Sequence, residues 1–403
     1  MAAPLISVAY ATVAPTLPAP TTDTFRRSDI GPSLPRQTRD TRPFVVQVKS
    51  FADIPAEVRR RVAAGERVIL ILLDAFGLEF LERQRDHPLI RRLEVTPLTS
   101  QFPSTTTAHV PSVHFGMPVH EHGLYEWNIL EPTLGEIICP LRFNATGAEE
   151  EGTLVGRLEP SVLAPGPTLY ESLAVPCIVA QPSRLAGSFS AIATRGAQVI
   201  GFRRLREGIR ALGEAFAAPG SDHRYALLYW DLIDRAGHDH GPSSPEFAVA
   251  CRRSLDELWE ARDALRAVTV LITADHGQVD VGPDRVDYLD DLWPDLPTLL
   301  SQPRPAGSPR DVFLHVHAEH VVTVIDELSA RLHGRADVRP AGELFERIGP
   351  RVQARLGDVA VLPAAGRQAW LRSAAANEQR FLGQHGGLHE AETSTYLARL
   401  TDL

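Results

Sequence analysis

The stretch VILILLDAFG at residues 68–77 contains an unbroken run of large aliphatic residues, closed by Asp74 and then Gly77. A continuous apolar run of this length, bounded by a polar residue and a glycine, is typical of a parallel β-strand that is buried on both faces. Two similar runs follow later, YALLYW at residues 225–230 and VTVLITA at residues 268–274. Both are also followed by aspartates. The three runs therefore predict strands of a parallel sheet.

Segments with helical periodicity accompany these runs. IPAEVRRRVAAGE at residues 54–66, FRRLREGIRALGEAF at residues 202–216 and the segment at residues 247–268 place apolar residues at intervals of three and four positions. Strands that alternate with helices predict an α/β fold with a mainly parallel central sheet flanked by helices. In such sheets, ligands gather at the carboxyl ends of the strands, so the aspartates at these ends are the first candidates for a functional site.

The chain is expected to form a single catalytic domain over residues 44–403, preceded by an irregular leader at residues 1–43 that is rich in Pro, Thr and Ala. Two segments are expected to be cap insertions in this domain. Residues 129–190 are dense in Pro and Gly, and residues 278–375 contain a strand-like and a helix-like stretch of their own. No uninterrupted apolar run reaches transmembrane length.

Charge and cysteine content limit the possible partners and compartments. The net charge of -9 argues against a nucleic-acid polymer or an anionic membrane as the main partner. The three cysteines are widely spaced and form no CxxC pair, which is typical of a reducing compartment. The first residues lack a positively charged segment and are interrupted by prolines, which disfavours a cleaved signal peptide. A cytoplasmic protein without a membrane partner is therefore expected, and the oligomeric state is open.

Carboxylate and imidazole side chains follow each strand-like run. Asp74 follows the first run, and Asp275 and His276 follow the third. Asp234 and His238, four residues apart, follow the second. A lone aspartate after a strand commonly caps the next helix, but three strand ends with such residues favour a metal site. Carboxylates and imidazoles together suit zinc, with manganese as the alternative.

The segment FPSTTTAH at residues 102–109 offers the hydroxyl groups of Thr105, Thr106 and Thr107 as nucleophiles. A run of threonines is often only an exposed loop or an edge strand, and a free threonine hydroxyl is a weak nucleophile. Coordination to a divalent ion would make the hydroxyl alkoxide-like near neutral pH. A second ion nearby could polarise a phosphoryl group or hold the attacking water. Two metal ions would thus explain why a threonine could act.

Six motifs together resemble the alkaline phosphatase superfamily, and within it the type I phosphodiesterase and nucleotide pyrophosphatase branch. They are LLDAFG, FPSTTTAH, HEHGLYEWN, DRAGHDHGP, ADHG and QHGG, and they occur in the family's order between about residue 67 and residue 389. Such an ordered set is far more specific than any one motif. The resemblance implies an alkaline-phosphatase-like fold and a two-metal hydrolase of phosphodiester or nucleotide pyrophosphate bonds in small-molecule substrates.

The resemblance also implies roles for individual residues. It implies two metal ions, each with three ligands: Asp74, Asp275 and His276 for the first, and Asp234, His238 and His385 for the second. Thr106 stands at the fifth place of the F-P-[ST]-x-T pattern that begins at Phe102, which implies that it binds the first metal and attacks phosphorus. Thr105 and Thr107 remain alternatives because the triplet blurs the register. Water at the second metal is expected to hydrolyse the phospho-threonine intermediate.

Neighbouring histidines are alternatives to two of these ligands. His240 could replace His238, but the GH-x-x-GP context favours His238. His389 could replace His385, but the HGG context favours His385.

Three further residues are expected to contact substrate. Asn128 resembles the asparagine that binds a phosphoryl oxygen in this branch, Trp127 could support a leaving group, and His109 is the best candidate among the histidines after the threonine run. Tyr125 and Phe76 could extend the apolar surface beside Trp127, with core packing as the alternative.

Other activities of the superfamily are alternatives. A phosphomonoesterase would share the same ligands, but no basic residue stands near the Thr106 motif to bind the additional charge of a monoester. A sulfatase-like or phosphonate hydrolase is less favoured, because sulfatases carry Cys or Ser in a C/S-x-P-x-R context. A non-catalytic binding module on this fold would be expected to have lost a ligand, and none is lost.

Overall fold

A computed structural model describes residues 48–401, with gaps at residues 149, 151, 267, 375 and 376. The leader predicted for residues 1–43 lies outside the described residues. Among the helices in this part of the chain, none is both long and apolar enough to cross a membrane.

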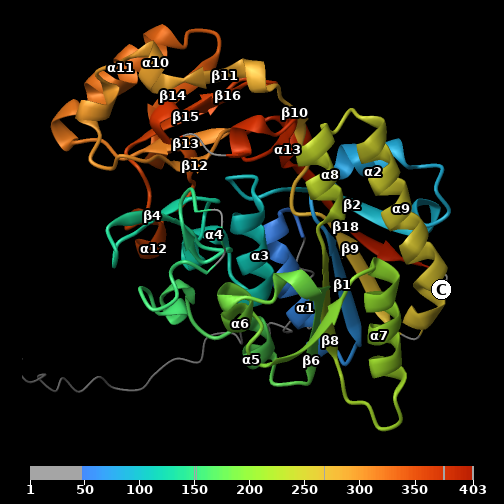
Figure 1. The fold of residues 1–403 in the computed structure, drawn as a ribbon. Coiled ribbons are helices and arrows are strands. Elements are labelled where there is room, and N and C mark those ends of the chain that lie inside the picture. The colour runs from blue at the N-terminus through green and yellow to red at the C-terminus, as the bar shows by residue number, and fades with distance from the viewer. Residues whose placement is uncertain (1–47, 149, 151, 267, 375–376, 402–403) are drawn as a thin grey trace, which may run out of the picture. The chain divides into compact units, whose positions relative to one another are not determined.

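A seven-stranded sheet forms the centre of the fold, and its mainly parallel direction confirms the predicted α/β class (Figure 1). In order across the sheet, the strands are β2 (Leu93–Thr99), β18 (Ser394–Leu400), β9 (Thr269–Thr273), β1 (Val68–Leu73), β8 (Tyr225–Trp230), β6 (Cys177–Pro182) and β7 (Ala197–Phe202). β18 is antiparallel to β2 and β9, and the other neighbours are parallel. The three aliphatic runs of the sequence are the adjacent strands β9, β1 and β8. Their carboxyl ends therefore meet at one edge.

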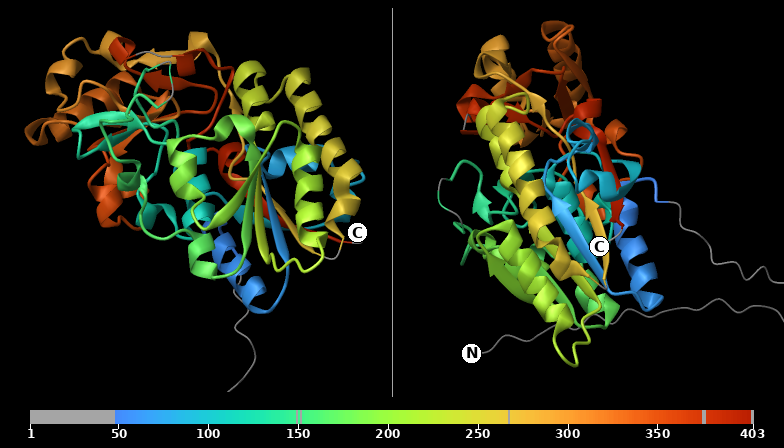
Figure 2. Two further views of the ribbon diagram at one scale, coloured as in Figure 1. Left: turned by 60° about the horizontal axis from the view of Figure 1, so that its bottom comes forward. Right: turned by 90° about the vertical axis from the view of Figure 1, so that its right-hand side faces the viewer.

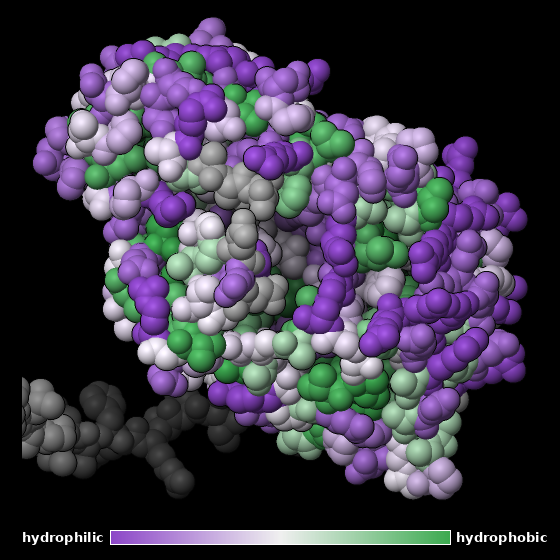
Figure 3. Space-filling model, in the orientation of Figure 1, coloured by the Kyte–Doolittle hydropathy of each residue, from purple (hydrophilic) through white to green (hydrophobic). Residues whose placement is uncertain are grey.

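One face of the sheet is covered by two long amphipathic helices. Ile69, Ile71 and Leu73 of β1 lie in a hydrophobic cluster with residues of α7 (Leu205–Ala217) and α9 (Pro245–Ala261). Figure 3 shows hydrophilic residues over the outward side of α9. The helix therefore presents its apolar side to the sheet, as its periodicity predicts.

The opposite face of β1 is buried as well. Its other three residues lie in a second hydrophobic cluster with α1 (Ile54–Ala63), α3 (Thr106–Phe115) and α5 (Leu169–Leu173). Helices thus lie on both faces of the sheet, as Figures 1 and 2 show. This double burial explains why the strand is apolar at every position rather than at every second one.

The helices predicted from periodicity are present, with shifted ends. The segment at residues 54–66 forms α1, which ends before the left-handed Gly65 (φ 86°). The segment at residues 202–216 forms α7. The segment at residues 247–268 forms α9, followed by a 3₁₀ turn at Arg262–Leu265.

Four smaller sheets surround the central one. A four-stranded antiparallel sheet has the order β12 (Ala306–Ser308), β13 (Asp311–Leu314), β15 (Val359–Pro363) and β14 (Ala336–Pro340). A three-stranded sheet consists of β3 (Ile129–Glu131), β4 (Glu136–Cys139) and β5 (Asn144–Ala145). Two-stranded sheets pair β10 (Val279–Asp280) with β17 (Gly383–Gln384), and β11 (Val286–Tyr288) with β16 (Gln368–Trp370).

The remaining helices are mostly short. They are α2 (Leu78–Arg83), α4 (Val119–His122), α6 (Ser188–Ala193), α8 (Leu232–His240), α10 (Leu289–Leu292), α11 (Val321–Arg331), α12 (Pro350–Gln353) and α13 (Glu390–Thr393).

Most of the smaller sheets come from the two segments predicted as insertions. The range 129–190 contains β3, β4 and β5, but it also contributes β6 to the central sheet. The range 278–375 contains the whole four-stranded sheet. The division of the chain into a leader, one catalytic domain and two insertions stays a prediction.

A buried ion pair ties the four-stranded sheet to the end of the chain. Arg310, beside β13, and Glu392 of α13 are 1% and 0% exposed and form a two-pronged contact at 3.1 and 2.9 Å. Glu392 Oε1 also accepts from the Gly387 backbone N–H at 3.0 Å. The pair therefore fixes the loop that joins β17 to α13.

Loss of one partner should be costly. We expect Glu392→Ala to lower the free energy of unfolding by about 3–5 kcal/mol, because the Arg310 guanidinium is left buried without its carboxylate. Glu94→Ala is the matched control, since Glu94 pairs with Arg399 at 2.7 Å on the exposed surface. Its loss should cost about 1 kcal/mol or less. Urea denaturation of both variants measures the difference, and equal losses would contradict the assigned role of the buried pair.

Candidate functional site

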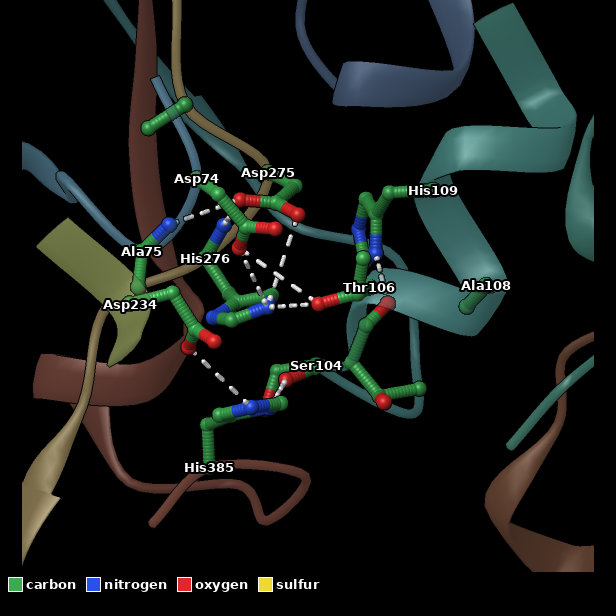
Figure 4. Close-up of polar contacts among 12 residues, drawn as sticks. Asp74, Ala75, Ser104, Thr106, Ala108, His109, Asp234, Asp275, His276 and His385 are labelled. Atoms are coloured by element: carbon green, nitrogen blue, oxygen red, sulfur yellow. Dashed lines mark hydrogen bonds and ion pairs between the residues drawn. The ribbon is translucent and has the colours of Figure 1, made fainter. Parts of the chain in front are cut away.

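A first group of ligand-type side chains stands at the ends of β1 and β9. Asp74 follows β1 directly, and a single residue, Ala274, separates β9 from Asp275 and His276. His276 Nε2 lies 3.6 Å from Asp74 Oδ1 and 3.5 Å from Asp275 Oδ2 (Figure 4). All three side chains are buried, and their ligand atoms are close enough to hold one metal ion.

A second group combines α8 with the loop after β17. Asp234 and His238 lie on the same side of α8 because they are four residues apart. His238 Nε2 lies 3.3 Å from Asp234 Oδ1, and His385 Nε2 lies 3.6 Å from the same oxygen. These three residues could hold another metal ion.

The two groups are neighbours, and Thr106 lies against the first. The rings of His276 and His385 stack with their centroids 3.8 Å apart. Thr106 Oγ1 lies 3.2 Å from His276 Nε2 and 3.4 Å from Asp74 Oδ1. Because Thr106 is the first residue of α3, its hydroxyl stands at the positive end of the helix dipole.

The three threonines of the run differ in their surroundings. Thr105 and Thr106 both line a cavity, but only Thr106 is partly exposed, and the side chains of Thr105 and Thr107 are buried. Among the described residues, no hydrogen-bond partner reaches Thr107 Oγ1. Thr106 is the threonine whose hydroxyl contacts the first group.

Backbone carbonyls orient the imidazoles of both groups. The Nδ1 atoms of His238 and His385 contact the carbonyl oxygens of Gly383 at 2.8 Å and Ser104 at 3.1 Å. His276 Nδ1 lies 3.0 Å from the carbonyl oxygen of the next residue. A carbonyl can only accept, so each Nδ1 carries the proton and each Nε2 lone pair points into its group.

In both groups, carboxylates are buried without an arginine or lysine partner in the described part of the chain. Burial raises the pKa of Asp74, Asp234 and Asp275, the last to about 7, and the charge of Asp275 raises the pKa of Asp74 further. Burial lowers the pKa of His276 and His385, so these imidazoles are neutral. No hydrogen-bond donor among the described residues reaches Asp275 Oδ2. Neutral imidazoles and crowded carboxylates with a free oxygen fit a divalent cation.

A cavity of about 980 Å³ opens beside the two groups. Thr106, His238 and His385 line it on the side of the groups, and Trp127 and Asn128 also contribute to its wall. The amide of Asn128 is held within the protein, since its Nδ2 donates to Gly307 O at 3.0 Å and its Oδ1 accepts from Thr146 Oγ1 at 3.0 Å.

Several residues of the cavity wall were not predicted from the sequence to belong to the site. They are Arg142, Tyr288, Arg380 and Phe381. The lack of basic residues near the Thr106 motif in the sequence does not extend to the folded cavity, because two arginines line it. These side chains come from distant parts of the chain, so no local pattern could identify them.

Other predicted contacts lie away from the cavity wall. His109 is completely buried behind the threonine run, where Nδ1 contacts Thr105 O at 2.7 Å and Nε2 accepts from the Gln101 backbone N–H at 2.8 Å. Both ring nitrogens are therefore used inside the protein, which corrects its predicted contact with substrate. Tyr125 and Phe76 are also completely buried and pack in the core.

The two alternative histidines stand outside the ligand groups. His240, the last residue of α8, is exposed, and His389 caps α13 by accepting from the Ala391 backbone N–H at 3.2 Å.

Two residues that support the ligands were not predicted. The Tyr229 hydroxyl donates to Asp74 Oδ2. Gln278 Nε2 donates to Asp234 Oδ1 at 2.6 Å. Gln278 directly follows the ADHG motif, so the sequence could have suggested that it lies near the ligands. The contact of Tyr229 with Asp74 depends on the pairing of β8 with β1, which the sequence alone does not give.

Comparison with known proteins agrees with the geometry. Residues 180–388, about half of the chain, match the family described as type I phosphodiesterase / nucleotide pyrophosphatase. Mouse ectonucleotide pyrophosphatase/phosphodiesterase family member 3 is 24% identical over 275 residues, which covers 63% of this chain and 30% of the relative. Bovine bis(5'-adenosyl)-triphosphatase ENPP4 is 33% identical over 79 residues, 16% of each chain. The chain thus matches less than a third of the length of either relative.

Solved structures share the fold. An inactive variant of murine ectonucleotide pyrophosphatase/phosphodiesterase 5 in complex with AMP has a TM-score of 0.62 at 16% identity. The superposition covers 83% of this chain and 87% of the murine chain. Phosphonoacetate hydrolase from Sinorhizobium meliloti, in complex with phosphonoformate, has a TM-score of 0.59 at 18% identity, with 84% and 92% covered.

Metal binding should depend on pH. Because burial raises the pKa of Asp275 to about 7, this carboxyl holds a proton in the metal-free protein below neutral pH, and a metal must displace it. The imidazoles of His276 and His385 add no such competition, because burial lowers their pKa. We therefore expect the affinity for Zn2+ to rise between pH 6 and 7, by about tenfold for each proton displaced.

Calorimetric titration of Zn2+ into metal-stripped protein at pH 6, 7 and 8 measures this affinity. The same titration of Asp275→Asn, which has no carboxylate proton at this position, is the control and should show a weaker pH dependence. An affinity that is constant or falls with pH in the unmodified protein would contradict the assignment.

Proposed function

The chain belongs to the type I phosphodiesterase / nucleotide pyrophosphatase family, and from this premise we propose that it is a metal-dependent hydrolase of phosphodiester or nucleotide pyrophosphate bonds. The observation that carries the proposal is the position of Thr106, whose hydroxyl lies within 3.4 Å of two residues of one ligand group and beside a second group. A hydroxyl in contact with one such group and beside another suits attack on phosphorus, which supports the proposal.

Each ligand group would hold one divalent cation. Asp74, Asp275 and His276 would hold the first ion together with Thr106, and Asp234, His238 and His385 would hold the second. Zinc is the ion we propose, with manganese as the alternative, because both accept carboxylate and imidazole ligands. When bound, the ions would balance the buried carboxylates, lower the pKa of the attacking hydroxyl and water, and stabilise the charge of the phosphoryl oxygens.

Thr106 performs the covalent step in this proposal. Its Oγ1 forms a bond to phosphorus while the bond from phosphorus to the departing oxygen breaks, and a phospho-threonine results. Water then cleaves the phospho-threonine and restores the hydroxyl. The positive end of the dipole of α3 would favour the negative charge of the phosphoryl group. Asn128 is the residue we propose to orient it from the cavity wall.

The substrate is proposed to be a small phosphodiester or nucleotide. The volume of the cavity, about 980 Å³, is at the upper end of the range for small-molecule sites. Trp127, Tyr288 and Phe381 offer aromatic surface for a base or another planar group. We also propose the cytoplasm as the compartment, since the three cysteines are widely spaced in the sequence and form no CxxC pair.

A phosphomonoesterase of the same superfamily is the second candidate. Arg142 and Arg380 both line the cavity, and a guanidinium group suits the additional negative charge of a monoester. A non-catalytic binding module is disfavoured because both ligand groups are complete.

Substitution of the nucleophile tests the proposal. We expect Thr106→Ala to lower kcat/KM for bis-p-nitrophenyl phosphate by about 10³-fold or more, because no other serine or threonine hydroxyl contacts the first ligand group among the described residues. Thr107→Val is the matched control, since its buried hydroxyl makes no hydrogen bond in this part of the chain and valine has nearly the same shape. It should keep most of the activity.

The same assay with p-nitrophenyl phosphate separates the two candidate activities. A higher kcat/KM on the diester supports the phosphodiesterase, and a higher value on the monoester supports the alternative. If Thr106→Ala stays fully active while Thr107→Val is inactive, the nucleophile assignment is wrong.

A further inference from the structure

Glu126 and Asp311 form a buried acidic pair beside the cavity. Both side chains are 0% exposed, and their carboxyl groups are hydrogen-bonding partners. Neither belongs to the two ligand groups. Glu126 directly precedes Trp127 and Asn128 of the cavity wall, and Asp311 lies close to Ser308 on another part of the wall. The pair therefore joins two segments that are far apart in the sequence.

Each carboxyl group receives one donor from its own segment. The Trp127 backbone N–H donates to Glu126 Oε2, and the Ser308 hydroxyl donates to Asp311 Oδ1 at 2.5 Å. Within the described part of the chain, no donor reaches the remaining oxygens, Glu126 Oε1 and Asp311 Oδ2. Two ionised carboxylates would repel each other in this buried position, whereas one proton between them turns the repulsion into a strong hydrogen bond.

We propose that Glu126 and Asp311 share one proton at neutral pH, and that the resulting bond holds the two segments of the cavity wall together. Both are positioning residues in this proposal, because they act through Trp127, Asn128 and Ser308 rather than on the reacting atoms. The proton supplies the donor that both free oxygens lack, so the pair carries a single negative charge.

The pair also touches both sides of the proposed site. The Thr105 hydroxyl, next to Thr106, hydrogen-bonds to the glutamate of the pair. Gly386, next to His385, packs so closely that a methyl group added there would lie 2.6 Å from Asp311 Oδ1. Separation of the pair would therefore disturb the nucleophile loop and a ligand loop together.

Other charged and titratable groups around the pair are accounted for. Glu392 adds to the negative potential at Asp311, but it is held in the ion pair with Arg310. Tyr125 stays neutral, because burial and the charges of the pair raise the pKa of its hydroxyl. Within the described residues, none of these groups donates a hydrogen bond to Glu126 Oε1 or Asp311 Oδ2.

The bond should weaken as the pH rises. Burial raises the pKa of Glu126 to about 8, while a glutamate in the unfolded chain has a pKa of about 4.3. Between these values the folded protein binds more protons than the unfolded chain, so the contribution of the pair to stability decreases with rising pH. Burial and the charge of Glu126 raise the pKa of Asp311 as well, so the shared proton is lost only at alkaline pH.

Glu126→Gln tests the proposal, because its amide supplies a permanent hydrogen to Asp311. Metal-loaded wild type and variant are compared from pH 6 to 9 by their thermal unfolding midpoints and by kcat/KM for bis-p-nitrophenyl phosphate. We expect the midpoint of the variant to rise relative to that of the wild type as the pH increases. The ratio of kcat/KM at pH 9 to that at pH 7 should be higher in the variant, since the wild type loses the proton as the pH rises whereas the amide keeps its hydrogen. Asp311→Asn should behave in the same way.

Two results would overturn the proposal. The first is an identical pH dependence of the unfolding midpoint in wild type and both amide variants. The second is a divalent ion that native mass spectrometry finds in the wild type and not in Glu126→Gln, since a metal rather than a proton would then fill the gap. The unfolding midpoints need no turnover, so this test can fail or succeed independently of the proposed hydrolase activity.

Discussion

Like-charged carboxylates buried at one edge of the central sheet are the constraint on which the rest of the site depends. Asp74 and Asp275 follow two adjacent parallel strands, so the pairing of β1 with β9 is enough to bring the two residues together. Burial and mutual repulsion raise the pKa of Asp74, and the neutral imidazole of His276 cannot compensate the charge. Only protons or cations can make such a site stable. This requirement, together with the imidazoles beside the carboxylates, supports the proposal that metal ions complete the site.

Buried negative charge is compensated in three different ways in this protein. Glu392 is paired with the guanidinium of Arg310, and the Glu126–Asp311 pair is proposed to hold a proton. The two ligand groups contain imidazoles whose Nε2 atoms face the carboxylates, as His276 does. Imidazole lone pairs beside carboxylates form a ligand set for a metal ion, whereas the Glu126–Asp311 pair is carboxyl groups alone, which can share a proton.

The sequence predicted those features that depend on local pattern. A strand buried on both faces must be apolar throughout, so β9, β1 and β8 could be recognised, and their ends located the ligand groups. The choice of Thr106 over its neighbours needed the resemblance to a family, because the threonine triplet alone does not fix the register. Arg142 and Arg380 were missed because the cavity wall is assembled from distant segments. His109 was misplaced because a motif gives proximity to a nucleophile but not the direction in which a side chain points.

The number of metal ions bound by the folded chain tests the central claim most directly. Native mass spectrometry of the protein, loaded with excess Zn2+ and then freed of loosely bound metal, measures the mass added to each chain. The two complete ligand groups should retain two ions per chain. A chain that retains no ion, or only one at saturation, would contradict the account of a site that two cations complete.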